Sequence, residues 1–153
     1  MKIDIKYLDK EIDKLKKIEK GDLIDMRVSR VIINGEEAEL PCTYKFGDTV
    51  FVKLGVAMRL PEGYKGNVYP RSGTFKNYGL LLTNSVGQID NSYRGNEDEW
   101  SAMFWATRDG RIEKNDRIVQ FDISKATMEN IEFNETEILE ETNRGGYSST
   151  GVK

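Results

Sequence analysis

Apolar and polar residues alternate in several short stretches of this 153-residue chain, the pattern of β-strands with one buried face. Ile3, Ile5 and Tyr7 alternate with charged residues, and residues 49–60 alternate through apolar positions such as Val50. Many short strands separated by turns predict an all-β sandwich or closed barrel. Further strands are predicted over residues 66–69, 80–83, 101–107, 117–123 and 131–139.

Turns and short helices are predicted between these strands. Asn34-Gly35 is a two-residue hairpin signal, and Asp109-Gly110 is a second turn. Residues 9–20 carry apolar side chains at helical spacing, which predicts a short amphipathic helix with Asp9 as its cap. One internal helix is predicted over residues 72–77.

The chain has the length of a single domain, predicted over residues 1–139, with residues 1–20 as an N-terminal strand and amphipathic segment. Residues 140–153 are polar and glycine-rich, which predicts a flexible C-terminal arm. Glycine N–H groups and hydroxyl groups in the arm can bind phosphate, so we expect it to close over an anionic ligand.

Composition excludes several kinds of site. The chain has no histidine, so any general base is a carboxylate, lysine, tyrosine or Cys42, and a metal must be held by oxygen atoms, which favours Mg²⁺ or Ca²⁺. A net charge of −3 gives no basic excess for nucleic-acid binding, and no apolar stretch is long enough to span a membrane. The single cysteine and the absence of an apolar leader sequence lead us to expect a cytoplasmic protein.

Four polar and glycine-rich motifs follow one another in a fixed order. They are Pro70-Arg71-Ser72-Gly73, Gly87-Gln88-Ile89-Asp90-Asn91-Ser92-Tyr93-Arg94-Gly95, Asp116-Arg117-Ile118-Val119-Gln120 and Arg144-Gly145-Gly146-Tyr147-Ser148-Ser149-Thr150-Gly151. In this order they resemble successive motifs of the trimeric dUTP pyrophosphatases (dUTPases), and the resemblance runs from Gly21 to Lys153. It implies a distorted jelly-roll-like β-barrel, a homotrimer with active sites between subunits, and hydrolysis of dUTP to dUMP and pyrophosphate with Mg²⁺.

Asp90 is the candidate catalytic residue. Sequence alone favours a role in starting a turn, although an ionised carboxylate there can accept a proton from water. The resemblance implies that Asp90 deprotonates the attacking water and that Tyr93 packs under the deoxyribose, where it excludes a 2′-hydroxyl. A hairpin over residues 83–90 would bind uracil, with Asn84, Gly87 and Ile89 as its candidate contacts.

Phosphate binding is assigned by the same resemblance to the other motifs. Arginine offers a planar fork for two phosphate oxygens, and serine and glycine add donors. The Asp116-Arg117 pair is expected to be structural. The candidate phosphate-binding residues are Arg71, Ser72, Gly73 and Gln120, together with Arg144, Gly145, Ser149 and Thr150 of the arm.

The candidate metal contact is Asp25, which the resemblance places on a water of a Mg²⁺ ion held mainly by the triphosphate. An alternative alignment uses Glu39 instead, but Asp25 has the expected residue type and follows the Gly21 turn. The arm is two residues shorter than the common family pattern. Tyr147 or Trp100 is therefore expected to cover the uracil, and the alternative for Trp100 is that both it and Trp105 pack in the fold.

Two other functions stay open at this point. One is a dCTP deaminase of the same fold. The other is a non-enzymatic trimer that binds a regulatory protein, in a phage-encoded chain, with the insertion over residues 28–48 as the candidate surface.

Overall fold

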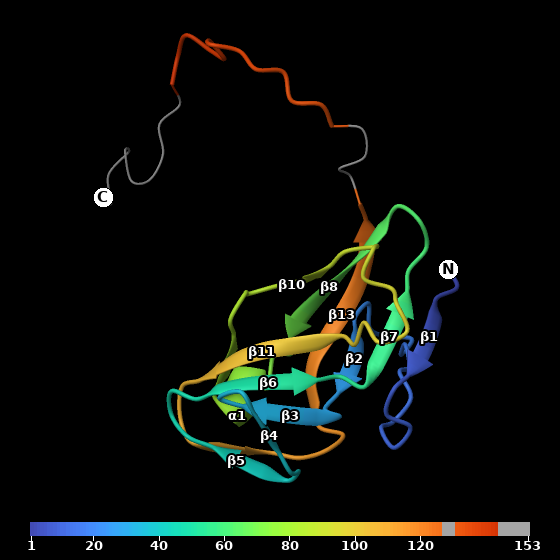
Figure 1. Ribbon diagram of the computed structural model, residues 1–153, viewed down its shortest axis with the longest axis vertical. Helices are drawn as coiled ribbons and strands as arrows, with labels where there is room; N and C mark the ends of the chain where they lie inside the picture. The colour runs from blue at the N-terminus through green and yellow to red at the C-terminus, as the bar shows by residue number, and fades with distance from the viewer. Residues whose placement is uncertain (127–130, 144–153) are drawn as a thin grey trace.

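The computed structural model describes residues 1–126 and 131–143 (Figure 1). Its one helix in this part of the chain is α1, Thr74–Tyr78, and the rest of the regular structure is β. The strands are β1 (Asp4–Tyr7), β2 (Ile24–Arg27), β3 (Arg30–Ile33), β4 (Glu36–Ala38), β5 (Cys42–Tyr44), β6 (Thr49–Lys53), β7 (Val56–Arg59), β8 (Tyr64–Pro70), β9 (Leu80–Leu82), β10 (Gly87–Ile89), β11 (Ser101–Ala106), β12 (Gly110–Ile112) and β13 (Arg117–Lys125).

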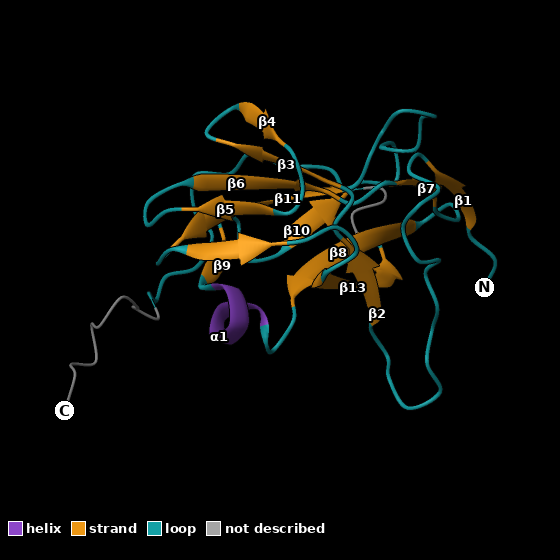
Figure 2. Cartoon of the chain, turned by 90° about the horizontal axis from the view of Figure 1, so that it is seen from below, coloured by secondary structure: helices purple, strands orange, loops and turns teal. Residues whose placement is uncertain are grey.

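Two larger sheets form the body of the domain (Figure 2). One has five strands in the order β4-β3-β6-β11-β9, and the other has four in the order β10-β8-β13-β2. Alternate side chains of both sheets point inward, and the buried positions join in a single hydrophobic cluster. The all-β prediction is therefore confirmed. No helix in the described residues has the length and apolar character needed to cross a membrane.

Several predicted elements are confirmed. The Asn34-Gly35 turn joins β3 to β4, with positive φ angles of 51° and 88° that suit a tight hairpin. The predicted strands over residues 66–69, 80–83, 101–107 and 117–123 correspond to β8, β9, β11 and β13, and the helix over residues 72–77 corresponds to α1.

Two predicted elements are wrong. Residues 9–20 contain no helix, because long-range contacts hold this segment instead: the Ser29 hydroxyl donates to the Asp9 carboxylate at 2.7 Å, and Ile12 is buried in the core. Residues 131–143 contain no strand, and Figure 1 shows the chain of this segment running away from both sheets. The apolar side chains of the predicted strand, such as Phe133 (95% exposed), are exposed.

Gly55 lies at the junction that divides the predicted strand over residues 49–60 into β6 and β7. Its φ is +68°, and a Cβ atom there would stand 2.9 Å from Ile12 Cδ1 and 2.9 Å from Ser29 Cβ. The Gly55 carbonyl accepts hydrogen bonds from the N–H groups of Leu8 at 2.8 Å and Asp9 at 3.2 Å. The N-terminal segment therefore packs directly on this junction.

Gly55→Ala should lower the free energy of unfolding by about 3 kcal/mol or more, because the methyl group adds a clash to the strain of a positive φ. Gly35→Ala is the matched control: its φ is +88°, but nothing lies within 4 Å of the added Cβ. That control should lose only about 1–2 kcal/mol. Urea unfolding measures both losses, and equal losses would contradict the packing argument.

Candidate active site

The sheet of β2, β8 and β13 brings one group of predicted site residues together. Asp25 on β2 lies opposite Gln120 on β13, and Gln120 lies opposite Tyr69 on β8, two residues before Arg71. The Asp25 carboxylate pairs with Arg71 Nε at 2.7 Å and with Arg117 Nη1 at 3.3 Å. These four residues, Asp25, Arg71, Arg117 and Gln120, are called the Arg71 cluster below. Arg117, which was expected to have a structural role, joins this cluster through its ion pair with Asp25.

Arg71 is held in place by Thr74, a residue that the sequence did not single out. The Arg71 N–H donates to Thr74 Oγ1 at 2.9 Å, and that hydroxyl donates to the Ile118 carbonyl at 2.8 Å. Thr74 is 1% exposed, so both bonds are shielded from water. Between Arg71 and Thr74 in the chain, Ser72 is exposed and Gly73 is the N-cap residue of α1.

A second group surrounds a hollow of about 330 Å³ on the other side of β8. Asp90 and Tyr93 lie in the loop after β10, and their neighbours come from the outward faces of β6 and β11. These neighbours occupy outward-facing positions in strands that show only an alternating apolar pattern. They belong to no sequence motif, so the sequence did not indicate them. The hollow is lined by Phe51, Lys53, Gln88, Ile89, Asp90, Tyr93, Glu99 and Ser101.

Asp90 is held in its ionised form. Its Oδ1 accepts from the Ser92 N–H at 3.0 Å and from the Ser92 hydroxyl at 3.1 Å. These two bonds lower the pKa of the Asp90 carboxyl, with the backbone donor contributing most. No hydrogen bond within the described part of the chain reaches Oδ2, so this oxygen can accept a proton from a water molecule.

Tyr93 lines the same hollow as Asp90; the residue is 40% exposed, and its hydroxyl is anchored. Its Oη donates to the Glu99 carbonyl at 3.1 Å. Burial, followed by the negative charges of Asp98 and Glu99, raises the pKa of the Tyr93 hydroxyl, which keeps it protonated as a donor.

β10 is the outer strand of its sheet, so the N–H and C=O groups along its free edge are not paired with another strand of that sheet. Gly87 lies opposite Val68, and a Cβ at Gly87 would stand 3.2 Å from Val68 Cβ, so glycine permits the close approach to β8. Asn84 lies exposed in the turn that leads into β10, and Ile89 lines the hollow. Residues 83–86 form a turn and residues 87–89 form β10, but β10 pairs with β8 while β9 pairs with β11, so the two strands do not pair with each other as a hairpin.

The expectation that Trp100 covers a bound base is wrong. Trp100 is 0% exposed and packs edge-on against Phe121, with ring centroids 5.3 Å apart. Its alternative, a role in packing, is the correct one. Trp105 is 40% exposed and contacts Phe46 on the outer face of the five-stranded sheet. The predicted arm residues Arg144, Gly145, Tyr147, Ser149 and Thr150 lie outside the described residues.

The residues present fit a metal that arrives with its ligand rather than one resident in the protein. Within residues 1–126 and 131–143, no group of three or more acidic or cysteine side chains could hold a metal ion. The Asp25 side chain is 29% exposed beside two guanidinium groups, so it can reach a water on a phosphate-bound Mg²⁺. Glu39 lies in a different groove, beside Arg30 and Lys114, which favours Asp25 over its alternative.

The two groups lie at opposite ends of β8. Ile89 pairs with Gly66, so Asp90 lies near Lys65, whereas Arg71 follows the last residue of the strand. Six residues of extended chain span about 20 Å. One chain therefore carries a carboxylate hollow and a guanidinium cluster too far apart to act on the same small phosphate ester.

Comparison with known proteins identifies the family. A family model described as dUTPase matches residues 37–151. The SPbeta prophage-derived deoxyuridine 5'-triphosphate nucleotidohydrolase YosS of Bacillus subtilis (strain 168) is 46% identical over 154 residues, covering 100% of each chain. A deoxyuridine 5'-triphosphate nucleotidohydrolase of Rickettsia akari (strain Hartford) is 41% identical over 116 residues, covering 74% of this chain and 76% of the relative.

Solved structures agree with this result at the level of the fold. A variant of the Staphylococcus bacteriophage 80alpha dUTPase with dUpNHpp has a TM-score of 0.71 at 20% identity, covering 99% of each chain. A variant dUTPase from phage phi11 of S. aureus, described with a structural Mg(II) ion, has a TM-score of 0.66 at 16% identity, covering 92% of this chain and 98% of that one. The fold is a distorted, jelly-roll-like, all-β barrel. Within that class, the chain belongs to the dUTPase family.

Ser92→Ala should raise the pKa of Asp90 toward its ordinary value, because the hydroxyl donor is lost while the larger contribution of the Ser92 N–H remains. Because a carboxylate accepts a proton only when it is ionised, a catalytic role for Asp90 predicts that the acid limb of the activity profile moves to higher pH. Carboxyl-carbon NMR titration of Asp90 measures the pKa directly. Ser92→Thr keeps a hydroxyl and should retain the original titration; an unchanged pKa in Ser92→Ala would contradict the assignment.

Proposed function

We propose that this chain is a dUTP diphosphatase that hydrolyses dUTP to dUMP and pyrophosphate. The activity would limit uracil in DNA and supply dUMP for dTMP synthesis, acting on the deoxynucleotide pool of the cytoplasm. The observation that carries the proposal is the Asp90 carboxylate, ionised and with Oδ2 available, in a hollow that it shares with the anchored ring of Tyr93.

Asp90 accepts a proton from a water molecule, and the water oxygen attacks the α-phosphorus in line with the leaving pyrophosphate. A bond forms between the water oxygen and the α-phosphorus, and the bond from that phosphorus to the bridging oxygen breaks. The electron pair of the broken bond leaves with pyrophosphate. Asp90 needs no raised pKa for this step, because its carboxylate is already ionised at neutral pH.

Base and sugar are selected beside Asp90. The free edge of β10 offers backbone donors and acceptors to uracil, with Asn84, Gly87 and Ile89 lining the approach. The Tyr93 ring lies under the deoxyribose and leaves no room for a 2′-hydroxyl, so UTP is rejected by a steric clash.

The triphosphate binds the Arg71 cluster, with Ser72 and Gly73 as further donors. Asp25 would hold a Mg²⁺ ion through water, and the ion would supply neutralisation of the charge on the leaving group. Arg144, Gly145, Ser149 and Thr150 of the arm would close over the phosphates, with Tyr147 over the base. In this proposal residues 1–139 form the domain and residues 140–153 the arm.

A homotrimer brings the separated groups together. The outer face of the five-stranded sheet carries an apolar stripe next to the Asp90 hollow, in which Met103 is 38% exposed, Trp105 40% and Leu81 45%. Phe133 and Leu139 of the extended segment are 95% and 89% exposed. Such apolar area next to an incomplete site favours burial against further copies of the chain.

Asp90→Asn should lower kcat for dUTP by about 10²–10⁴-fold, because the amide cannot accept the proton from water. Asp109→Asn is the matched control: Asp109 is also an exposed turn carboxylate, and its pKa is lowered by the Phe46 N–H and Lys45. That variant should keep full activity. The assay measures pyrophosphate release from dUTP, UTP, dCTP and dTTP with Mg²⁺.

Release from dUTP alone supports the proposal. Ammonia release from dCTP would support the deaminase alternative instead. Turnover of none of the four nucleotides would leave the non-enzymatic, partner-binding trimer.

Subunit mixing tests where the site lies. Asp90→Asn and Arg71→Ala should each be inactive alone, yet trimers that contain both variants should regain part of the wild-type activity. Regain is expected because some sites then combine an intact Asp90 with an intact Arg71 from another copy. Co-expressed chains with different affinity tags isolate the mixed trimers. If both residues acted within one chain, mixed trimers would stay inactive.

A further inference from the structure

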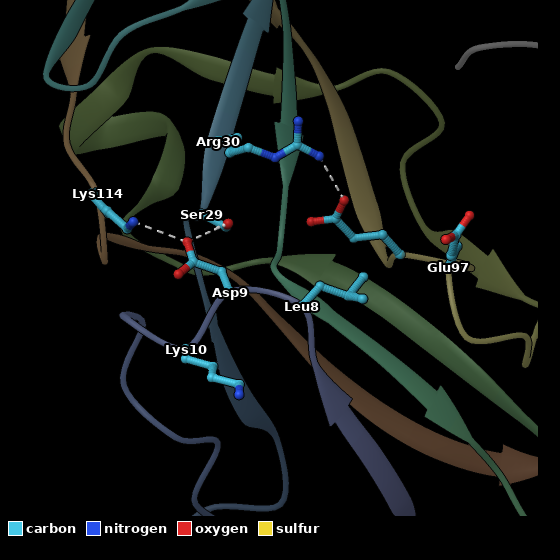
Figure 3. A pocket seen from close by; sticks show the side chains of 8 residues that line it. Leu8, Asp9, Lys10, Ser29, Arg30, Glu97 and Lys114 are labelled. Atoms are coloured by element: carbon cyan, nitrogen blue, oxygen red, sulfur yellow. Dashed lines mark hydrogen bonds and ion pairs between the residues drawn. The ribbon is translucent and has the colours of Figure 1, made fainter.

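A groove of about 590 Å³ lies next to the substrate hollow and shares Glu99 with it. Figure 3 shows the Arg30 side chain directed at the Glu99 carboxylate across this groove, with Asp9, Ser29 and Lys114 interacting on the opposite side. Glu99 is therefore part of the wall between the groove and the site that contains Asp90 and Tyr93.

The Glu99 carboxylate is buried and held by fixed partners. Glu99 is 7% exposed, and it is the only acidic or basic residue classed as buried among those the structure describes. Its Oε1 accepts from the Gly55 N–H at 2.9 Å, and its Oε2 pairs with Arg30 Nη2 at 3.0 Å and with Lys53 Nζ at 3.8 Å. A buried charge without partners is strongly destabilising, so these contacts restrict Glu99 to one position.

The backbone on either side of Gly55 fixes the same segment. The Trp100 N–H donates to the Val56 carbonyl at 2.9 Å, and the Leu54 N–H donates to the Trp100 carbonyl at 3.0 Å. Together with the Glu99–Gly55 bond, these contacts attach residues 99–100 to the junction of β6 and β7.

The Glu99 carbonyl in turn fixes two side chains of the substrate hollow. It accepts from Tyr93 Oη at 3.1 Å and from Ser101 Oγ at 3.0 Å. Tyr93 belongs to an exposed loop, and in the described residues its hydroxyl has no other hydrogen-bond partner. The position of its ring therefore depends on where the Glu99 carbonyl stands.

We propose that Glu99 is a positioning residue for sugar discrimination. Its buried carboxylate, held by Gly55 and Arg30, fixes the carbonyl that anchors the Tyr93 hydroxyl, and so sets how closely the ring approaches the 2′ position of the sugar. This inference rests on the proposed dUTP hydrolysis. It adds a determinant of specificity that makes no contact with the reacting atoms.

The test compares kcat/KM for dUTP and UTP. Glu99→Ala should lower the dUTP-to-UTP ratio by at least ~10-fold, mainly through faster use of UTP, while kcat for dUTP changes by less than ~3-fold. Tyr93→Phe, which removes the anchored hydroxyl, should lower the ratio to a similar extent. Glu99→Gln keeps an oxygen for the Gly55 N–H, so its ratio should stay closer to that of the wild type than the ratio of Glu99→Ala.

Two further variants keep the inference testable. Glu97→Ala removes an exposed carboxylate that lines the same groove, and its ratio should equal that of the wild type. Arg30→Met breaks the ion pair from a half-exposed position, so it should lower the ratio even if Glu99→Ala fails to fold.

A wild-type ratio in Glu99→Ala and Arg30→Met, with a lowered ratio in Tyr93→Phe, would overturn the role of Glu99. A wild-type ratio in Tyr93→Phe would overturn the hydroxyl anchor itself. Failure of the wild-type protein to prefer dUTP over UTP would instead count against the proposed function, and it is measured before any variant is made.

Discussion

The buried Glu99 carboxylate at the junction of β6 and β7 is the interaction on which the site depends. Taking an ionised group out of water costs several kcal/mol, so its position is tolerated only where donors are already in place. Gly55 supplies one donor through a backbone N–H that its positive φ orients, and Arg30 supplies another from β3. The same junction receives the N-terminal segment, which connects the stability of the fold to the geometry of the hollow.

The sequence predicted the fold well where strands are long enough to show alternation. β6, β8, β11 and β13 were predicted on that basis. Among the strands of three or four residues, β1, β3 and β9 were predicted from an alternating stretch, a turn signal or an apolar run, whereas β2, β5, β10 and β12 lack such a signal and were not predicted as strands. Residues 9–20 show why periodicity alone misleads. Their apolar residues have helical spacing, but the segment is held in an irregular path by contacts with distant parts of the chain. Ile12 is buried in the core, and the Asp9 carboxylate accepts a hydrogen bond from Ser29.

The candidate site residues also divide into those that a local sequence pattern indicates and those that only the fold brings together. Asp90, Tyr93 and Arg71 could be named from motifs, because their chemistry is carried by neighbours in sequence. The Asp25–Arg71 ion pair and the support from Thr74 depend on strand register, which no local pattern contains. Trp100 was misjudged because three acidic residues precede it. The charge nearest to it, that of Glu99, is buried against Arg30, so an acidic neighbourhood did not mean a surface position.

The Arg71 cluster and the Asp90 hollow are built differently and lie at opposite ends of β8. In the cluster, Asp25 balances part of the charge of Arg71 and Arg117, and Thr74 supports the Arg71 backbone. The hollow is formed in part by an exposed loop, whose Tyr93 hydroxyl is anchored on the Glu99 carbonyl. The family model begins at residue 37, yet the anchor draws on Arg30 and on the segment around Asp9, which precede it. The relative from Bacillus subtilis matches over the whole chain, including this part. The N-terminal segment thus packs on the Gly55 junction that holds the Glu99 carboxylate, so it is part of the barrel's support rather than an appendage.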